Sequence, residues 1–146
     1  MHLLPTLSTH AYFVPGTNPY PLEQENRYIL LVDDSVLVSE RLAALLPEAG
    51  IDLPLLRAAD YAQAVDFIAQ RPPFIAVLDI NLPGRNGLEL LRTIRTLHEE
   101  IIVIMLSNRT GYYYRQVAQD LGADYFLDKS NDFEHLPSLL HRLIYP

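Results

Sequence analysis

The chain has 146 residues and a formal net charge of −7; 49 % of its residues are hydrophobic and 20 % are charged. These values predict one globular domain and argue against a largely disordered chain. The absence of cysteine excludes disulfides, cysteine-ligated metal centres and a thiol nucleophile. The acidic balance does not favour nucleic-acid binding, and no apolar run reaches the roughly 18 residues of a membrane span. We therefore expect a cytoplasmic protein that binds neither nucleic acid nor membrane.

Residues 1–26 differ in character from the rest of the chain. They hold four of the eleven prolines and show neither the helical nor the strand period. This composition predicts a flexible, proline-rich N-terminal extension over 1–26, followed by a folded domain over 27–146.

From residue 27 onward, short apolar runs alternate with helical patterns. The spacing predicts strands over 27–32, 53–59, 73–79, 101–106 and 124–128. It predicts helices over 35–50, 61–70, 88–98, 111–122 and 133–144. Pro47 is expected to shorten the first helix, whereas Pro137 falls in the first turn of the last helix, where a missing N–H costs little. The alternation favours an α/β fold, a doubly wound parallel sheet with helices on both faces.

Polar side chains follow four of the predicted strands. Asp33 and Asp34 come after the first, Asp79 after the third, Ser107 after the fourth, and Lys129 after the fifth. In an open parallel sheet, ligands bind at the carboxyl ends of the strands. Three clustered carboxylates repel one another unless a cation neutralises them, and Mg²⁺ suits oxygen ligands. The hydroxyl and the ammonium suit a phosphoryl group. The pattern predicts a site for Mg²⁺ and a phosphoryl group, with a carboxylate as nucleophile.

Each of these residues also has a simpler interpretation. An acidic pair after a strand is a common helix N-cap, and a single Asp, Ser or Lys at a strand end is common in turns or on the surface. Lys129 is nevertheless the sole lysine beside ten arginines, which favours a specific need for a compact ammonium there. The functional interpretation depends on the joint placement of the residues.

Four motifs share the pattern of one family. They are LLVDDS, VLDINLPGRNGLELL, IMLSN and LGADYFLDKS, and the second contains Asp79, Pro83 and Gly87 at D-x3-P-x3-G spacing. With these motifs, residues 27–144 resemble the receiver domain of bacterial two-component response regulators. The resemblance implies the flavodoxin-like receiver fold, a five-stranded parallel sheet in the order 2-1-3-4-5.

The resemblance also implies roles for the acidic residues. Asp79 would be the phospho-acceptor, and Mg²⁺ would be the cofactor. Asp34 would bind the metal directly and Asp33 mainly through water, while Asp79 and the backbone carbonyl of Asn81 would complete the metal site.

Three further residues match the family's phosphoryl-binding and switch positions. Ser107 would hydrogen-bond the phosphoryl oxygens, Lys129 would pair with them, and Phe126 would be the aromatic switch residue acting with Ser107. Two positions depart from the family pattern: Ser130 replaces the usual proline after the lysine, and Asn108 replaces a small residue after the switch hydroxyl.

The implied partners are proteins. A histidine kinase or phosphotransfer protein would supply the phosphoryl group, and an effector or a second copy would bind the face formed by the fourth helix, fifth strand and fifth helix. Helical spacing turns four residues of 111–122 inward: Tyr114, Val117, Ala118 and Leu121. Tyr112 and Tyr113 then face solvent as partner-surface anchors, or only cover the core edge. We expect a stand-alone receiver in a phosphorelay, not an enzyme.

Three other functions share parts of this sequence pattern. A dehalogenase-type enzyme with an Asp nucleophile needs D-x-D after its first strand, but Asp79 follows the third strand and Asn81 stands two residues later. An FMN-binding module needs a Ser/Thr/Gly-rich loop where this chain has DDSVLVS. A degenerate receiver that acts only as a scaffold stays open because of Asn108 and Ser130.

Overall fold

The computed structural model describes residues 27–146, and the structural statements below refer to that part of the chain. The extension expected over 1–26 lies outside the described residues and stays a prediction. The described part forms one parallel sheet with strand order β2-β1-β3-β4-β5, which confirms the fold expected from the sequence.

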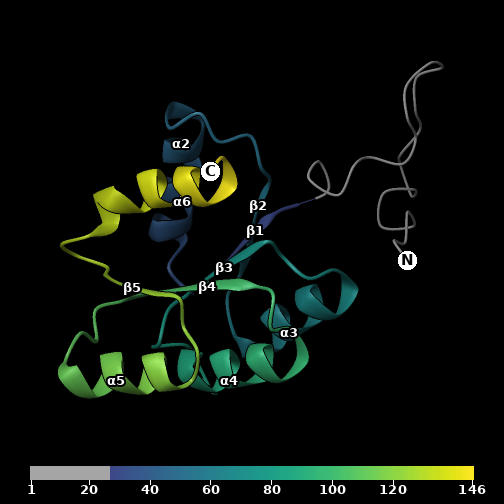
Figure 1. Cartoon of the computed structure of the whole chain (residues 1–146), viewed down its shortest axis with the longest axis vertical. Helices are drawn as coiled ribbons and strands as arrows, with labels where there is room; N and C mark the ends of the chain where they lie inside the picture. The colour runs from purple at the N-terminus through teal and green to yellow at the C-terminus, as the bar shows by residue number, and fades with distance from the viewer. Residues whose placement is uncertain (1–26) are drawn as a thin grey trace.

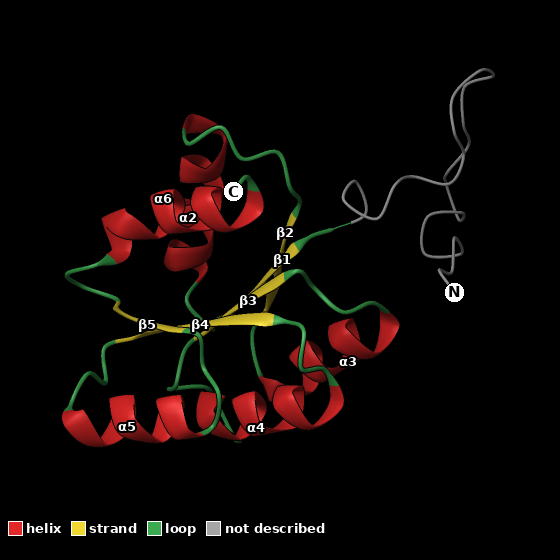
Figure 2. Ribbon diagram, in the orientation of Figure 1, coloured by secondary structure: helices red, strands yellow, loops and turns green. Residues whose placement is uncertain are grey.

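Strands and helices alternate along the chain. The strands are β1 (Ile29–Val32), β2 (Leu55–Ala58), β3 (Ile75–Leu78), β4 (Ile102–Ser107) and β5 (Tyr125–Asp128). The helices are α2 (Val36–Glu48), α3 (Tyr61–Gln70), α4 (Gly87–Leu97), α5 (Tyr112–Asp120) and α6 (Leu136–Ile144), the last preceded by the 3₁₀ turn η2 (Phe133–His135). Helices α2 and α6 cover one face of the sheet, and α3, α4 and α5 cover the other (Figures 1 and 2).

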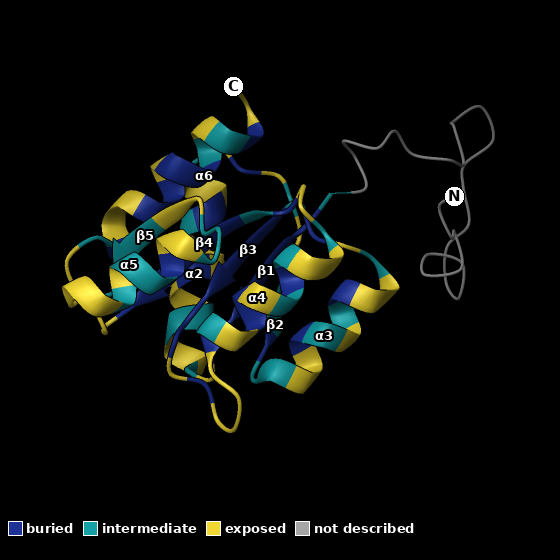
Figure 3. Cartoon of the chain, turned by 60° about the horizontal axis from the view of Figure 1, so that its bottom comes forward, coloured by how far each residue is buried: buried dark blue, intermediate teal, exposed yellow. Residues whose placement is uncertain are grey.

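The central strands are apolar throughout because both of their faces are covered. All residues of β1 and β3 are buried, and β4 is buried after its first residue, whereas the edge strands β2 and β5 are mostly half-buried (Figure 3). Along β1, Leu30 packs into the core beneath α3, α4 and α5, and Leu31 packs into the core beneath α2 and α6. This alternation holds both helical layers against one rigid sheet.

Side-chain caps set three helix starts close to the predicted ones. Ser35 accepts a hydrogen bond from the Val38 N–H at the start of α2, and Asp60 accepts one from Gln63 at the start of α3. Asn86 and Glu89 form a reciprocal capping box on α4. Each cap satisfies backbone N–H groups that have no partner inside the helix.

The two prolines behave differently from one another. Helix α2 runs through Pro47 and ends one residue later, at Glu48. The helix expected over 133–144 begins instead as the 3₁₀ turn η2, and α6 starts at Leu136. Pro137 has no N–H to reach the Phe133 carbonyl as an α-helix requires, and the Leu136 N–H takes that carbonyl in 3₁₀ geometry.

None of the helices in residues 27–146 is long and apolar enough to cross a membrane.

Candidate functional site

The backbone ladder of the sheet continues one residue past several strand ends. The Asp33 N–H donates to the Ala58 carbonyl at 3.0 Å, the Asp79 N–H to Val32 at 2.9 Å, and the Lys129 N–H to Ser107 at 3.0 Å. These bonds extend the parallel register beyond β1, β3 and β5. The residues predicted from separate strands therefore meet at one edge of the sheet.

Three carboxylates form the centre of this site. Asp33, Asp34 and Asp79 each offer an oxygen, and these oxygens lie within 4.8 Å of one another. Asp33 and Asp79 are buried, at 0 % and 5 % exposure, while Asp34 is exposed. The predicted acidic cluster is thus present, and two of its members are buried while the third is exposed to solvent.

Lys129 joins the two buried carboxylates. Its Nζ lies 2.7 Å from Asp33 Oδ2 and 3.1 Å from Asp79 Oδ2. Burial on its own would lower the pKa of Lys129, but the hydrogen bond to Asp33 and the charges of Asp79 and Asp33 outweigh it and raise that pKa. The ammonium therefore stays charged. Its ion pairs with two buried carboxylates explain why the sole lysine of the chain stands at this strand end.

The cost of burying the negative charge of Asp79 is only partly compensated by its surroundings. Burial raises the pKa of its carboxyl, and the charge and hydrogen bond of Lys129 offset that rise only in part. Asp79 Oδ1 also accepts a 3.3 Å hydrogen bond from the Asn81 N–H, which orients the carboxylate.

The donor set fits a hard divalent cation. Three carboxylates converge, and Lys129 supplies one positive charge against them. Both Asp33 oxygens already have partners, since Oδ1 accepts the Ser35 N–H at 2.8 Å and Oδ2 pairs with Lys129. The exposed Asp34 carboxylate is the more available ligand. Oxygen ligands with excess negative charge are what Mg²⁺ and similar ions bind.

Ser107 and Phe126 lie on the neighbouring strands β4 and β5. Ser107 is buried, and its Oγ accepts a 3.0 Å hydrogen bond from the Arg109 N–H. Phe126 pairs in register with Met105, two residues before Ser107, and its ring lies 4.7 Å beneath the Arg115 guanidinium. The two predicted switch residues are therefore brought to adjacent strands.

The two departures from the family pattern contact each other. Ser130 Oγ donates to Asn108 Oδ1 at 2.9 Å and so links the loops after β4 and β5. Asp128 Oδ1 accepts the N–H groups of Ser130 and Asn131, at 2.8 and 3.2 Å, which lower the pKa of the Asp128 carboxyl and close the turn after Lys129. Residues 27–146 contain no cis peptide bond.

Arg109 is a site residue that the sequence interpretation missed. Its Nε donates to Asn81 Oδ1 at 2.9 Å, and its Nη1 donates to the Tyr114 hydroxyl at 3.1 Å. The available signal was a basic residue two positions after Ser107, at the end of a strand whose neighbours end in carboxylates.

Comparison with known proteins agrees with this geometry. The sequence pattern of the response regulator receiver domain matches residues 29–141. The chain belongs to this family. It is thus a response regulator receiver domain of two-component systems, and the dehalogenase-type and FMN-binding interpretations lose their basis.

Relatives of known description support the same assignment. The chain is 34 % identical over 116 residues to the response regulator MprA of Mycobacterium sp. (strain KMS), covering 80 % of this chain and 50 % of that protein. It is 27 % identical over 104 residues to the Fimbriae Z protein of Escherichia coli (strain K12), covering 71 % and 50 %. The receiver chain thus spans about half the length of the curated relatives it matches.

Solved structures show the same fold. The Mn(2+)-bound response regulator Rcp1 superposes with a TM-score of 0.69 at 26 % identity, covering 80 % of this chain and 91 % of that one. A LuxR-family two-component response regulator from Aurantimonas sp. SI85-9A1 superposes with a TM-score of 0.72 at 28 % identity, covering 80 % and 84 %.

The predicted partner surface of the receiver is exposed. Tyr112 and Tyr113 are 80 % and 67 % exposed, while Ala118 is buried and Tyr114 is half-buried against the core, as helical spacing predicts. A groove between α5 and β5, lined in part by Arg115 and Phe126, continues this surface.

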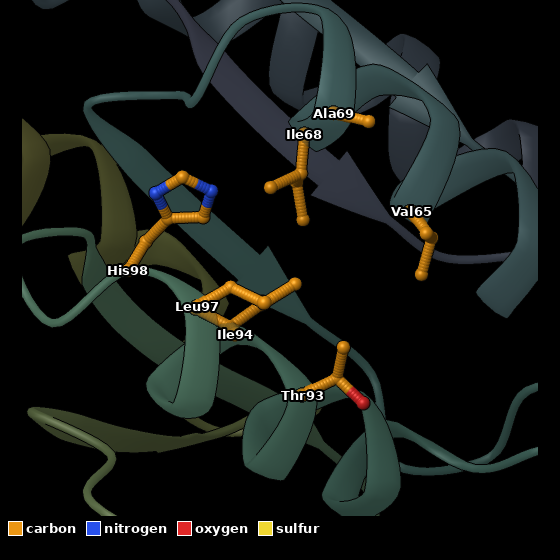
Figure 4. Close-up of a pocket in the computed structure, with 7 residues that line it drawn as sticks. All are labelled: Val65, Ile68, Ala69, Thr93, Ile94, Leu97 and His98. Carbon is orange, nitrogen blue, oxygen red and sulfur yellow. The ribbon is translucent and has the colours of Figure 1, made fainter.

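A small cavity of about 50 Å³ lies away from the carboxylates, between α3 and α4 of the receiver (Figure 4). Its lining is almost wholly apolar: Val65, Ile68, Ala69, Thr93, Ile94, Leu97 and His98. The predicted site residues are not among these side chains, so the cavity is separate from the acidic site.

Proposed function

We propose that this receiver domain accepts a phosphoryl group on Asp79 from a histidine kinase or phosphotransfer protein, with Mg²⁺ held by the carboxylate cluster. One observation carries the proposal. The Lys129 ammonium contacts both buried carboxylates, 2.7 Å from Asp33 and 3.1 Å from Asp79, at the carboxyl edge of the sheet. A carboxylate held beside a cation in this way is oriented and electrostatically prepared for phosphoryl transfer.

The proposed step is a direct transfer. An Asp79 carboxylate oxygen attacks phosphorus, and the new O–P bond forms as the P–N bond to the donor imidazole breaks. The imidazole keeps the electron pair of that bond. Lys129 and the Ser107 hydroxyl would hold the phosphoryl oxygens through charge-assisted and ordinary hydrogen bonds.

A cation in this site would be held by Asp34, Asp79 and the backbone carbonyl of Asn81, with Asp33 acting mainly through water. Mg²⁺ bound there would offset the negative charge of the carboxylates and of the phosphoryl oxygens. The convergence of the three carboxyl oxygens within 4.8 Å supports this assignment.

The two adjacent aspartates are expected to contribute unequally to the metal. Asp34→Ala should weaken Mg²⁺ binding more than Asp33→Ala, because Asp34 is exposed and available while both oxygens of Asp33 are engaged by Ser35 and Lys129. Loss of a group that acts through water costs about 10- to 100-fold in metal affinity, and loss of a direct ligand should cost more. Calorimetric titration of each purified variant with Mg²⁺ measures the order.

Circular dichroism of both variants controls for folding in this comparison. Asp66→Asn on the exposed face of α3 is the matched control and should bind Mg²⁺ as the wild type does. A larger loss in Asp33→Ala than in Asp34→Ala would reverse the proposed roles.

Signalling is proposed to pass through protein contacts, and no enzymatic action on a separate substrate is assigned. The candidate surface is the face of α5, β5 and α6, where a homodimer or an effector would bind. The exposed Tyr112 and Tyr113 side chains beside the α5–β5 groove support this choice, because aromatic anchors are common in protein interfaces.

The double variant Tyr112→Ala/Tyr113→Ala is expected to take up phosphate at Asp79 normally but to lose self-association or effector binding. Removal of two anchor rings should weaken association about tenfold or more, since each 1.4 kcal/mol is a factor of ten. Sedimentation and partner pull-down of the phosphorylated proteins measure the effect. Leu97→Ala, which removes an exposed apolar side chain of α4, is the control. Unchanged association in the tyrosine variant would exclude this face.

The proposed function is tested most directly by incubating the protein with Mg²⁺ and acetyl phosphate and recording the intact mass. Addition of one phosphoryl group that depends on Mg²⁺ is the expected result. No addition under these conditions, in protein that is folded by circular dichroism, would favour the scaffold alternative.

A further inference from the structure

Arg109 connects the acidic site to helix α5. Its Nε donates to Asn81 Oδ1 at 2.9 Å, and its Nη1 donates to the Tyr114 hydroxyl at 3.1 Å. The guanidinium carbon also lies 5.6 Å from the centre of the Tyr114 ring. One side chain thus bridges the loop after β3 and the first turn of α5.

Both ends of this bridge lead to functional positions. Asn81 stands two residues after Asp79, and its N–H donates to Asp79 Oδ1 at 3.3 Å. At the other end, the Tyr114 ring packs edge-on against Tyr113 with their centres 5.3 Å apart. The contacts therefore run without interruption from the phospho-acceptor to the exposed tyrosine surface.

The two partners of the Arg109 guanidinium are neutral, an amide oxygen and a hydroxyl. A guanidinium binds an anionic acceptor more strongly than a neutral amide oxygen or hydroxyl, because the attraction of opposite charges adds to the hydrogen bond. A phosphoryl group adds about −1.5 to −2 charge and three acceptor oxygens, in a geometry that guanidinium matches bidentately. Phosphorylation of Asp79 would thus place a stronger acceptor two residues before Asn81, the present partner of Arg109.

Phosphorylation of Asp79 would also affect the backbone of Arg109, through its hydrogen bond with Ser107. Its N–H donates to Ser107 Oγ at 3.0 Å, so a movement of Ser107 toward the phosphoryl group displaces the loop that carries Arg109. The N-cap residue of α5 is Gly111, so no side chain accepts a hydrogen bond from the first turn of this helix. If Arg109 releases Tyr114, no side-chain cap opposes a change in the conformation of that turn.

We propose that Arg109 is a phosphoryl-sensing residue that binds Asn81 and Tyr114 before phosphorylation and moves to the phosphoryl group on Asp79 afterwards. The exchange frees Tyr114 and changes the packing of Tyr113 on the partner surface. This inference rests on the proposed function, since it requires phosphorylation of Asp79, and it adds Arg109 to the groups that bind the phosphoryl group.

Fluorine NMR of protein labelled with 3-fluorotyrosine tests the exchange. The Tyr114 signal is identified by its absence in Tyr114→Phe. In the wild type it should shift on addition of Mg²⁺ and acetyl phosphate. In Arg109→Gln it should already lie near the phosphorylated position without the phosphodonor and lose most of the further shift. Arg92→Gln, which alters an exposed arginine of α4, should behave as the wild type does.

Intact mass of the same samples separates the two proposals. If the wild type takes up a phosphoryl group but the Tyr114 signal of Arg109→Gln moves as far as that of the wild type, the role of Arg109 is wrong and the proposed function stands. If the wild type takes up no phosphoryl group, the proposed function is wrong and the role of Arg109 falls with it.

Discussion

Asp79→Asn is expected to abolish Mg²⁺-dependent phosphorylation and to leave the fold intact. The amide has nearly the shape of the carboxylate but lacks the anionic oxygen that attacks phosphorus. Intact mass after incubation with Mg²⁺ and acetyl phosphate should therefore show no added phosphoryl group. The exposed Asp66→Asn on α3 is the matched control and should be phosphorylated as fully as the wild type. Undiminished uptake by Asp79→Asn would contradict the assignment of the acceptor.

The same replacement is expected to raise stability near neutral pH when Mg²⁺ is absent. Burial raises the pKa of Asp79 in the folded protein, so folding disfavours the ionised carboxylate even with Lys129 beside it. Asparagine removes that charge, and Lys129 keeps its 2.7 Å contact with Asp33. The advantage should be complete above the raised pKa and should vanish as pH falls below the ordinary carboxyl pKa, where Asp79 is neutral in both states.

Urea unfolding of the wild type and of Asp79→Asn at neutral pH and at about pH 3.5, below the ordinary Asp pKa, measures this dependence. A stability difference that grows as pH falls would show that the carboxylate is favoured by its surroundings, contrary to the pKa direction given above.

Gly87→Ala is expected to destabilise the receiver severely. Gly87 is the first residue of α4 and packs against the backbone of Asp79, and its N–H donates to the Ile80 carbonyl at 2.9 Å. A Cβ on Gly87 would overlap the Asp79 carbonyl oxygen and lie 2.8 Å from the Asp79 carbonyl carbon. Backbone atoms cannot move aside by changing a side-chain rotamer. We therefore expect the free energy of unfolding to fall by about 3 kcal/mol or more, the upper part of the range for overpacking. The urea midpoint measures this loss.

Gly111→Ser is the matched control for that experiment. It adds a Cβ where no heavy atom lies within 4 Å, and serine is a good N-cap for α5. Its stability should stay within about 0.5 kcal/mol of the wild type. A Gly87→Ala protein with an unchanged midpoint would show that the start of α4 can move away from Asp79 at little cost.

The acidic site was largely predictable because its residues follow the strands directly. The apolar run before Asp33 and the run before Asp79 mark strands that are buried on both faces, and a parallel sheet places their ends together. The structure brings both aspartates to one Lys129 ammonium, as that argument requires. The start of α2 was predictable for a similar local reason, since Ser35 caps it with its own side chain.

Contacts between loops were not predictable in this way. Asn81 and Arg109 are 28 residues apart, and Asn108 and Ser130 are 22 apart. No periodicity along the chain couples such positions, because their meeting depends on sheet register and on the path of each loop. Asn108 and Ser130 looked like two separate departures from the family pattern, and only the folded chain makes them one hydrogen-bonded pair.

The sequence by itself determined the α/β alternation, the fold family and the residues at the strand ends, because burial patterns and motif spacing are properties of neighbours along the chain. Only the tertiary structure decided which acidic residue is engaged and which is available, since Asp33 is buried against Lys129 while Asp34 is exposed. It likewise decided why Gly87 must lack a side chain and where the Arg109 guanidinium binds. Those properties arise where distant segments pack against each other, and packing distances are set by the whole fold.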